Sequence, residues 1–154
     1  MKNYLFLSLA VLIAMPAFAD KAPMPTDAPK SYEAECAGCH MAYPPGLLSQ
    51  KNWQNIMSGL SKHFGTDASL DVKTQTEITN WLVKNAASKY KYSALAPDNR
   101  ISKSTWFIKE HDEVRAEVWK RPSVKSAANC MAYHKDAASG GFSENNVQVP
   151  AKCE

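Results

Sequence analysis

Two cysteines three positions apart are followed at once by a histidine, in the segment Cys36-Ala37-Gly38-Cys39-His40. Two thiols at this spacing can each add to a vinyl group of haem, while the adjacent imidazole binds the iron from the same side. A thioredoxin-type redox site would need a βαβ context, and a zinc site would need two further ligands at compatible spacing. The sequence offers neither context. The segment therefore predicts one covalently bound c-type haem.

The sixth coordination position of that iron needs a second ligand. The chain has three further histidines, His63, His111 and His134. Of these, His63 lies seven residues after Ile56, on the shoulder of an apolar helical stripe. A histidine at a core edge is often only hydrogen-bonded to the backbone, but beside a haem-binding helix axial ligation is the better interpretation. Met41 and Met57 are competing thioether ligands that core filling would also explain, and we prefer His63.

A second, incomplete haem motif runs from Cys130 to His134. Tyr133 stands where a second cysteine would belong, so one thioether is lost. His111 is then left as the fourth imidazole, and four histidines suffice for two bis-histidine haems. A haem tethered by Cys130 alone should be attached poorly and partly occupied. The alternative is that no second haem binds, that His111 is a solvated surface residue, and that Cys130 pairs with Cys153 in a disulfide, which an oxidising compartment favours.

Helices must position these side chains, because no run of four to eight residues alternates convincingly as a strand. Ser31, Ser49, Asp71 and Ser104 are the expected N-caps, since their short side chains can accept hydrogen bonds from the first backbone N–H groups of a helix. The expected helices cover residues 31–40, 49–65, 71–88, 104–111 and 124–134. The predicted fold class is mostly α, with two haem-binding halves packed around the haems, long loops and little or no sheet.

The N-terminus has the features of a secretory signal. Lys2 precedes an apolar run over residues 4–14, and the small residues Ala17 and Ala19 suit a cleavage site after Ala19. Export by the Sec route to the periplasm is therefore expected. The apolar run is too short to span a bilayer, and no later stretch approaches about 20 apolar residues. We expect no transmembrane segment in the mature chain.

The expected organisation is a signal peptide at 1–19, a flexible leader at 20–30, an N-terminal haem module at 31–90 and a C-terminal module with the degenerate haem site at 91–154. The 154 residues include 18 basic and 15 acidic side chains, which gives a formal charge of +3. That excess is too small to indicate nucleic-acid binding.

The sequence resembles the small dihaem cytochromes c of bacterial periplasms, known as the DHC type, over nearly the whole mature chain. The matching segments are 35–48, 53, 59–60, 63–65, 67–71, 106–107, 110–111, 119 and 121–130. The resemblance implies two bis-histidine haem c groups, with His40 and His134 as proximal ligands and His63 and His111 as distal ligands. Tyr133 departs from the family pattern, in which a cysteine attaches the haem.

The expected function is electron transfer without a substrate at the iron, because two imidazoles saturate the metal. The family resemblance implies redox partners, namely a membrane cytochrome b that draws on quinol and a soluble monohaem cytochrome. The chain is therefore not expected to be an enzyme. The alternative is a haem enzyme or a gas-binding or sensing monohaem protein, either of which needs an open iron position.

Overall fold

The computed structural model describes residues 22–88 and 90–150, so the expected signal peptide and Cys153 lie outside the described residues. The helices are α1 (Lys30–Cys36), α2 (Gln50–Ser58), α3 (Val72–Lys84), α4 (Tyr90–Ser93) and α5 (Thr105–Glu110). Single 3₁₀ turns occur at Pro45–Leu47, Leu60–Lys62, Pro97–Asn99, Ile101–Lys103, Val118–Lys120, Cys130–Ala132, Ala137–Ser139 and Glu144–Asn146. Within 22–88 and 90–150 there is no strand, only isolated bridges. The prediction of a mostly helical fold with long loops is confirmed.

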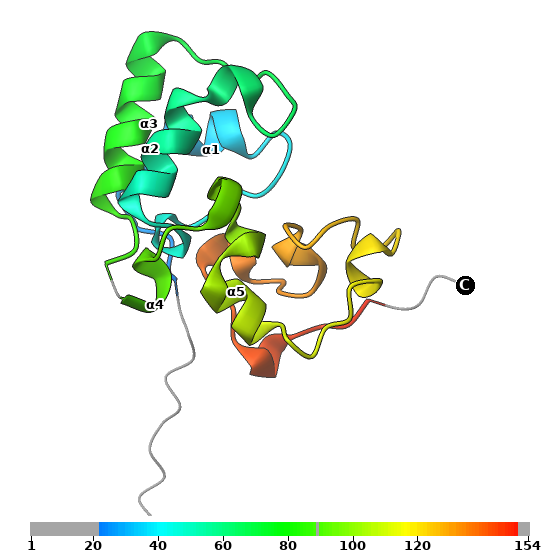
Figure 1. The fold of residues 1–154 in the computed structure, drawn as a ribbon. Helices are drawn as coiled ribbons and strands as arrows, with labels where there is room; N and C mark the ends of the chain where they lie inside the picture. The colour runs from blue at the N-terminus through cyan, green and yellow to red at the C-terminus, as the bar shows by residue number, and fades with distance from the viewer. Residues whose placement is uncertain (1–21, 89, 151–154) are drawn as a thin grey trace, which may run out of the picture.

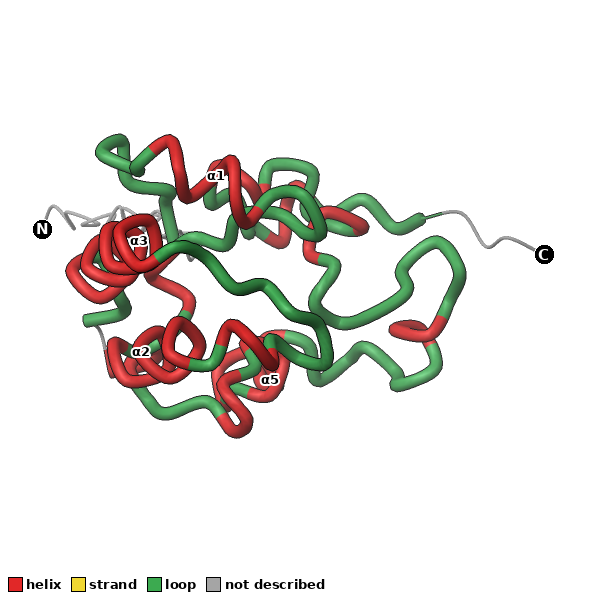
Figure 2. The backbone as a smooth tube through the Cα atoms, turned by 90° about the horizontal axis from the view of Figure 1, so that it is seen from above, coloured by secondary structure: helices red, strands yellow, loops and turns green. Residues whose placement is uncertain are grey.

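The two halves of the chain differ in their content of regular structure. Helices α1, α2 and α3 lie together in the upper part of Figure 1, and α5 lies below them beside the yellow-to-red segments. After α5, Figure 2 shows mainly loop, interrupted by single helical turns. In the described part of the chain, no helix is long and apolar enough to cross a bilayer.

Three of the four predicted N-caps are confirmed. Ser49, Asp71 and Ser104 each accept hydrogen bonds from backbone N–H groups in the first turn of α2, α3 and α5. The prediction for Ser31 is wrong, because α1 already begins after Pro29 and Ser31 lies inside it. The hydroxyl of Ser31 instead donates to Glu77 of α3 at 2.7 Å.

The first two helices are shorter than predicted. Helix α1 ends at Cys36, so the following residues up to His40 form a turn and loop rather than more helix. Helix α2 ends at Ser58 and gives way to the turn Leu60–Lys62. The chain then reverses through Phe64 and Gly65, whose φ angles of 50° and 103° cannot continue a right-handed helix.

The predicted helix over 124–134 is wrong. Lys125 has a φ of 71°, which breaks the helix at its start. Local side chains then satisfy the backbone: Asn129 Nδ2 donates to the carbonyl of Val124 at 2.9 Å, and Ser126 Oγ accepts from the N–H of Ala128 at 3.1 Å. Such side-chain bonds compete with helical hydrogen bonds. Only the turn Cys130–Ala132 is helical in this segment.

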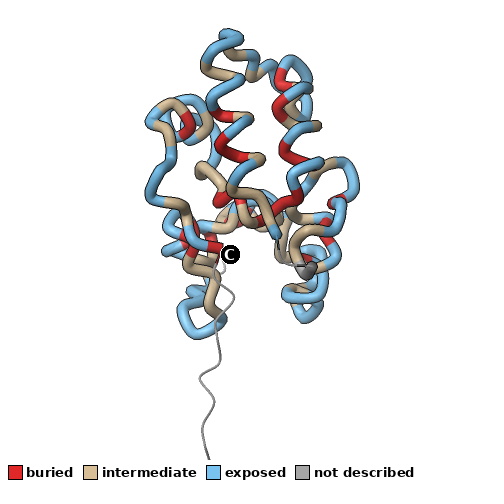
Figure 3. Tube along the Cα trace, turned by 90° about the vertical axis from the view of Figure 1, so that its left-hand side faces the viewer, coloured by how far each residue is buried: buried red, intermediate tan, exposed pale blue. Residues whose placement is uncertain are grey.

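The main hydrophobic core lies between α1, α2 and α3. Ile78 and Leu82 are fully buried on α3, and they pack with Trp53 and Met57 of α2. In Figure 3 the buried segments follow the inner sides of the upper helices. Met57, considered as an axial ligand, is only 3% exposed within this core.

Asn52 of α2 fixes the segment that leads from the first half of the chain to the second. Its side chain is fully buried, and its Nδ2 donates to the carbonyl of Ala96 at 3.0 Å and to Asn99 Oδ1 at 2.9 Å. Its Oδ1 accepts from the N–H of Ala96 at 3.0 Å and from Ser49 Oγ at 2.7 Å. The side-chain amide of Asn52 therefore hydrogen-bonds to both the N–H and the carbonyl of Ala96.

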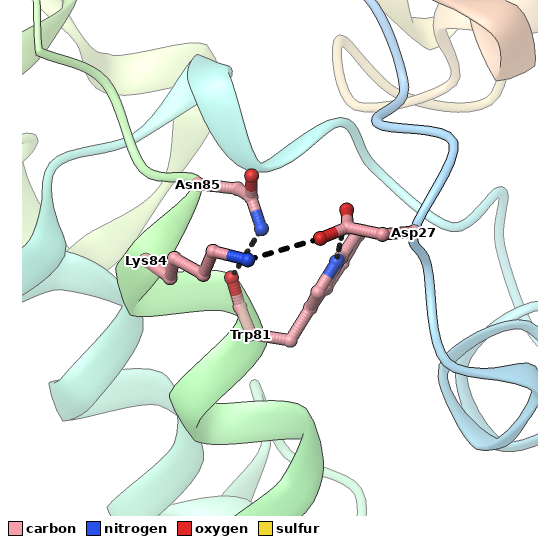
Figure 4. Close-up of polar contacts among 4 residues, drawn as sticks. All are labelled: Asp27, Trp81, Lys84 and Asn85. Carbon is pink, nitrogen blue, oxygen red and sulfur yellow. Dashed lines mark hydrogen bonds and ion pairs between the residues drawn. The ribbon is translucent and has the colours of Figure 1, made fainter.

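Asp27 attaches the segment before α1 to the end of α3 (Figure 4). Trp81 Nε1 donates to Asp27 Oδ1, and Lys84 Nζ contacts Asp27 Oδ2, both at 3.1 Å. The hydrogen bond from Trp81, followed by that from Lys84, lowers the pKa of the Asp27 carboxyl. Asn85 continues the group by donating to the carbonyl of Trp81 at 3.0 Å.

Candidate haem-binding sites

The imidazoles of His40 and His63 face each other although 23 residues separate them in the chain. His40 lies in the loop after α1, and His63 follows the turn Leu60–Lys62. Their ring centroids are 6.1 Å apart, with an interplanar angle of 34°. The fold of the first half therefore brings together the proximal and distal ligands expected from the sequence.

A backbone hydrogen bond orients His40 for metal binding. Its Nδ1 lies 2.7 Å from the carbonyl oxygen of Met41. A carbonyl can only accept a hydrogen bond, so Nδ1 carries the proton and Nε2 keeps its lone pair. This arrangement, with one ring nitrogen bonded to a backbone carbonyl and the other free, is typical of metal-binding histidines.

The two cysteines of the first motif lie on the approach to His40. Cys36 is the last residue of α1 and is half-buried, whereas Cys39 is exposed in the turn that follows. Burial raises the pKa of the Cys36 thiol to about 11, so it is protonated at neutral pH. The end of α1 thus places both attachment thiols of a c-type motif within four residues of the candidate ligand.

A second pair of imidazoles lies in the other half of the chain. His111 caps the C-terminal end of α5, and His134 follows the turn Cys130–Ala132. Their ring centroids are 6.2 Å apart, with an interplanar angle of 88°. His111 is half-buried and stacks on Phe107 at 4.1 Å, and its Nδ1 donates to the carbonyl of Phe107 at 2.8 Å. The same argument as for His40 leaves its Nε2 available for a metal.

The second pair lines a mostly apolar cavity of about 200 Å³. Aromatic rings form much of its wall, and Cys130 lies at the same wall as His134. The aromatic lining residues are Tyr92, Trp106, Phe107, Trp119, Tyr133 and Phe142. An apolar cavity with a few convergent polar groups is the usual setting of a cofactor site.

Two buried polar atoms at this cavity have no hydrogen-bond partner among the described residues, namely Tyr133 Oη and His134 Nδ1. A buried donor or acceptor without a partner is costly, so such atoms usually mark a functional or ligand site. Tyr133 also lies 6.2 Å from the ring of Trp119. The residue that replaces the second cysteine therefore belongs to the cavity wall.

In each histidine pair, the distance between the two rings fits a metal ion bound between them. Two metal–imidazole bonds of about 2.0 Å, with about 1.2 Å from each ring centre to its nitrogen, place the ring centres about 6.4 Å apart. The observed separations are 6.1 and 6.2 Å. Each ring can rotate about its metal–nitrogen bond, so interplanar angles of 34° and 88° are both compatible with axial ligation. The donor sets fit two bis-histidine haems.

One imidazole in each pair is biased toward the neutral, metal-binding form. The pKa of His63 is lowered, mainly by burial and secondly by the charge of the facing His40. The pKa of His134 is likewise lowered, mainly by burial and secondly by the charge of the facing His111. Only neutral imidazole has a lone pair for iron. Burial also raises the pKa of the Cys130 thiol to about 11.

Tyr43 contacts both sites in the structure, although no motif in the sequence indicates this role. Its ring stacks on His40 with a centroid distance of 4.8 Å and an angle of 30°. Its hydroxyl donates to the carbonyl of Ala128, two residues before Cys130, at 2.7 Å. The only sequence signal is its position three residues after His40, because the second contact spans 85 residues.

Comparisons with known proteins agree with this geometry. A family model described as dihaem cytochrome c matches residues 32–142. A dihaem cytochrome c from Shewanella baltica OS155 is similar over 79% of this chain and 93% of its own, with 36% identity and a TM-score of 0.70. A DHC from Rhodobacter sphaeroides is similar over 77% of this chain and 99% of its own, with 39% identity and a TM-score of 0.65. A search of curated proteins gave no match.

Proposed function

The chain belongs to the dihaem cytochrome c family of electron-transfer haem proteins, and we propose that it carries electrons on two bis-histidine haem c groups. The observation that carries the proposal is the pairing of all four histidines of the sequence, at 6.1 and 6.2 Å. Each pair lies in one half of the chain, which supports a division into haem modules at 31–90 and 91–154.

In the first site we assign Cys36 and Cys39 as the attachment thiols, with His40 and His63 as axial ligands. The hydrogen bond from His40 Nδ1 to the backbone fixes its tautomer and the direction of its free nitrogen. His63 directly precedes the chain reversal at Phe64 and Gly65.

In the second site we assign Cys130 as the one attachment thiol, with His134 and His111 as axial ligands. Because Tyr133 replaces the second cysteine, the site has a single thioether. Ligation of the iron and contacts with the apolar cavity must therefore provide most of the binding free energy that holds the haem. The presence of the cavity and of both imidazoles supports a second haem over a disulfide between Cys130 and Cys153. Cys153 lies outside the described residues.

When bound, haem supplies a one-electron change at its iron. The chain determines how that change is used. With haem bound, the imidazoles of His40 and His63 in one site, and of His111 and His134 in the other, would leave no coordination position open for a substrate or small gas. Imidazole in place of a methionine thioether also keeps the potential low. At the second site aromatic side chains line the cavity beside the ligand pair. These features favour electron transfer over catalysis at the iron.

We further propose that the protein works in the periplasm, after cleavage of residues 1–19, with a membrane cytochrome b as donor and a soluble monohaem cytochrome as acceptor. Lys2 and the apolar run at 4–14 support export. The partners are supported by family membership alone.

Carbon monoxide tests the coordination. Added to the reduced, matured protein, it should leave the visible spectrum unchanged, because no axial position is open. The variant His63→Ala is the control, since it opens one position and should give the spectrum of a carbon monoxide complex. A spectral change in the unsubstituted protein would overturn the bis-histidine assignment and favour a gas-binding or enzymatic haem.

A further inference from the structure

Tyr43 connects the two candidate haem sites through both ends of its side chain. Its ring lies against the imidazole of His40, the proximal ligand assigned to the first site, at a centroid distance of 4.8 Å. Its hydroxyl donates to the carbonyl of Ala128 at 2.7 Å. One side chain thus spans from an axial ligand of one site to the attachment segment of the other.

The carbonyl of Ala128 is directly linked to Cys130, the attachment thiol of the second site. It accepts a hydrogen bond from the backbone N–H of Cys130 at 3.0 Å, a bond that haem attachment at Sγ would leave in place. Tyr43 Oη and Cys130 therefore share one acceptor. Hydrogen bonds that converge on one carbonyl hold the participating segments in a fixed relation.

The backbone of Tyr43 is itself held by the core. Tyr32 Oη donates to the carbonyl of Tyr43 at 2.7 Å. Tyr32 is 3% exposed, and its ring lies 4.8 Å from that of Trp81 in the main core. The core thus bonds to the backbone of Tyr43, whereas only the Tyr43 hydroxyl reaches the second site.

Other contacts between the halves do not join ligating residues. Trp106 Nε1 donates to the carbonyl of Leu47 at 3.3 Å, and Asn52 binds Ala96 and Asn99. None of these residues is an assigned axial ligand or attachment cysteine. Among the contacts between the halves that the structure describes, the Tyr43 contact differs in touching both sites.

We propose that Tyr43 is the positioning residue for electron exchange between the two haems, holding the Cys130 attachment segment against the His40 ligand. This inference rests on the proposed function, because it requires both haems. In the exchange one electron leaves a ferrous haem and reduces a ferric one, so one iron is oxidised as the other is reduced. Tyr43 is neither oxidised nor deprotonated in this exchange. It acts by fixing the distance between the two haem sites and the contacts that connect them.

The matched variants are Tyr43→Phe and Tyr32→Phe, expressed with periplasmic haem maturation. Each removes one tyrosine hydroxyl bond of 2.7 Å to a backbone carbonyl, but only the first removes a contact with the second site. Haems per chain are counted first. Interhaem electron exchange is then followed by transient absorption after flash reduction, and backbone exchange over 126–134 is followed by hydrogen–deuterium mass spectrometry.

Tyr43→Phe should keep the first haem, slow interhaem exchange and lower amide protection over 126–134 about fivefold, the factor equivalent to about 1 kcal/mol for one net hydrogen bond. Tyr32→Phe should leave both quantities close to those of the parent. Loss of the second haem from Tyr43→Phe alone would also support the positioning role, since attachment at Cys130 requires its segment to be in place.

The outcomes separate the two proposals. A parent chain that carries one haem would overturn the two-haem function, and the role of Tyr43 with it. A parent with two haems whose exchange rate is unchanged by Tyr43→Phe would overturn the role of Tyr43 alone. Equal slowing in Tyr32→Phe would also overturn it, because the effect would then come from a loosened core.

Discussion

Replacing Asn52 by leucine should weaken the scaffold that connects the two haem sites. The leucine side chain has the same number of heavy atoms and the same branching as asparagine, but it offers no polar atoms. Asn52 is fully buried, and its amide is bonded to both the N–H and the carbonyl of Ala96, which is itself only 2% exposed. The substitution therefore leaves two backbone groups buried without these partners.

The expected cost follows from those two groups. Each buried backbone group that loses its partner costs about 1–3 kcal/mol, so the loss at Ala96 sums to about 2–6 kcal/mol of unfolding free energy. The other partners of Asn52 are less affected. Asn99 Oδ1 still accepts from Asn55 Nδ2 at 3.1 Å, and Ser49 Oγ still accepts from the backbone N–H of residue 52.

Urea denaturation of the matured protein, followed by far-ultraviolet circular dichroism, measures this cost. With a slope of about 2 kcal/mol per molar urea for a domain of this size, the midpoint for Asn52→Leu should fall by about 1–3 M. The control is Asn55→Leu, the same chemical change three residues along α2. It removes one part-buried hydrogen bond to Asn99 and should cost about 1 kcal/mol.

An Asn52→Leu protein no less stable than Asn55→Leu would contradict this expected cost. That result would mean that the N–H and carbonyl of Ala96 find other partners or water without penalty.

Four further predictions concern the haem sites and the N-terminal segment. His40→Ala should abolish the normal low-spin spectrum of the first haem, and an unchanged visible spectrum would exclude it as a ligand. His63→Met should keep the haem attached but raise one midpoint potential in a redox titration, whereas unchanged potentials and spectrum would exclude ligation by His63. Tyr133→Cys should attach the second haem by two thioethers instead of one, so its pyridine haemochrome band should move from the single-thioether position of the parent to that of the first haem; no second haem in either chain would contradict this. Because the pKa of the folded Asp27 carboxyl is lowered, its stabilisation is present above the unfolded value and disappears as pH falls through the folded value. In urea denaturation Asp27→Asn should therefore be less stable than the parent at neutral pH, the gap should close as the Asp27 carboxyl is protonated in acid, and a gap independent of pH would contradict this.

The sequence predicted features that depend on neighbouring residues. Ser49, Asp71 and Ser104 begin helices as expected, because an N-cap needs only its own side chain and the next three N–H groups. The segment from Cys36 to His40 was identifiable for the same reason. The spacing of its two thiols and its imidazole is sufficient to indicate covalent attachment of a haem.

The features that the sequence did not predict depend on local competition or on distant contacts. The helix expected at 124–134 fails because Ser126 and Asn129 bond to nearby backbone, and Lys125 adopts a left-handed conformation. The hydroxyl bond of Tyr43 joins residues 85 positions apart, and the amide of Asn52 binds residues 44 and 47 positions away. Such contacts arise only when the chain is packed.

The number of haems per matured chain shows whether both pairs of imidazoles bind haem. Chain expressed with periplasmic haem maturation is purified under native conditions, its haem is determined as the pyridine haemochrome, and its protein by amino-acid analysis. Two imidazole pairs at metal-bridging distance predict more than one haem per chain, with the ratio approaching two as the single-thioether site fills. A ratio of one, with His111→Ala leaving the spectrum unchanged, would show that the second pair of imidazoles binds no haem.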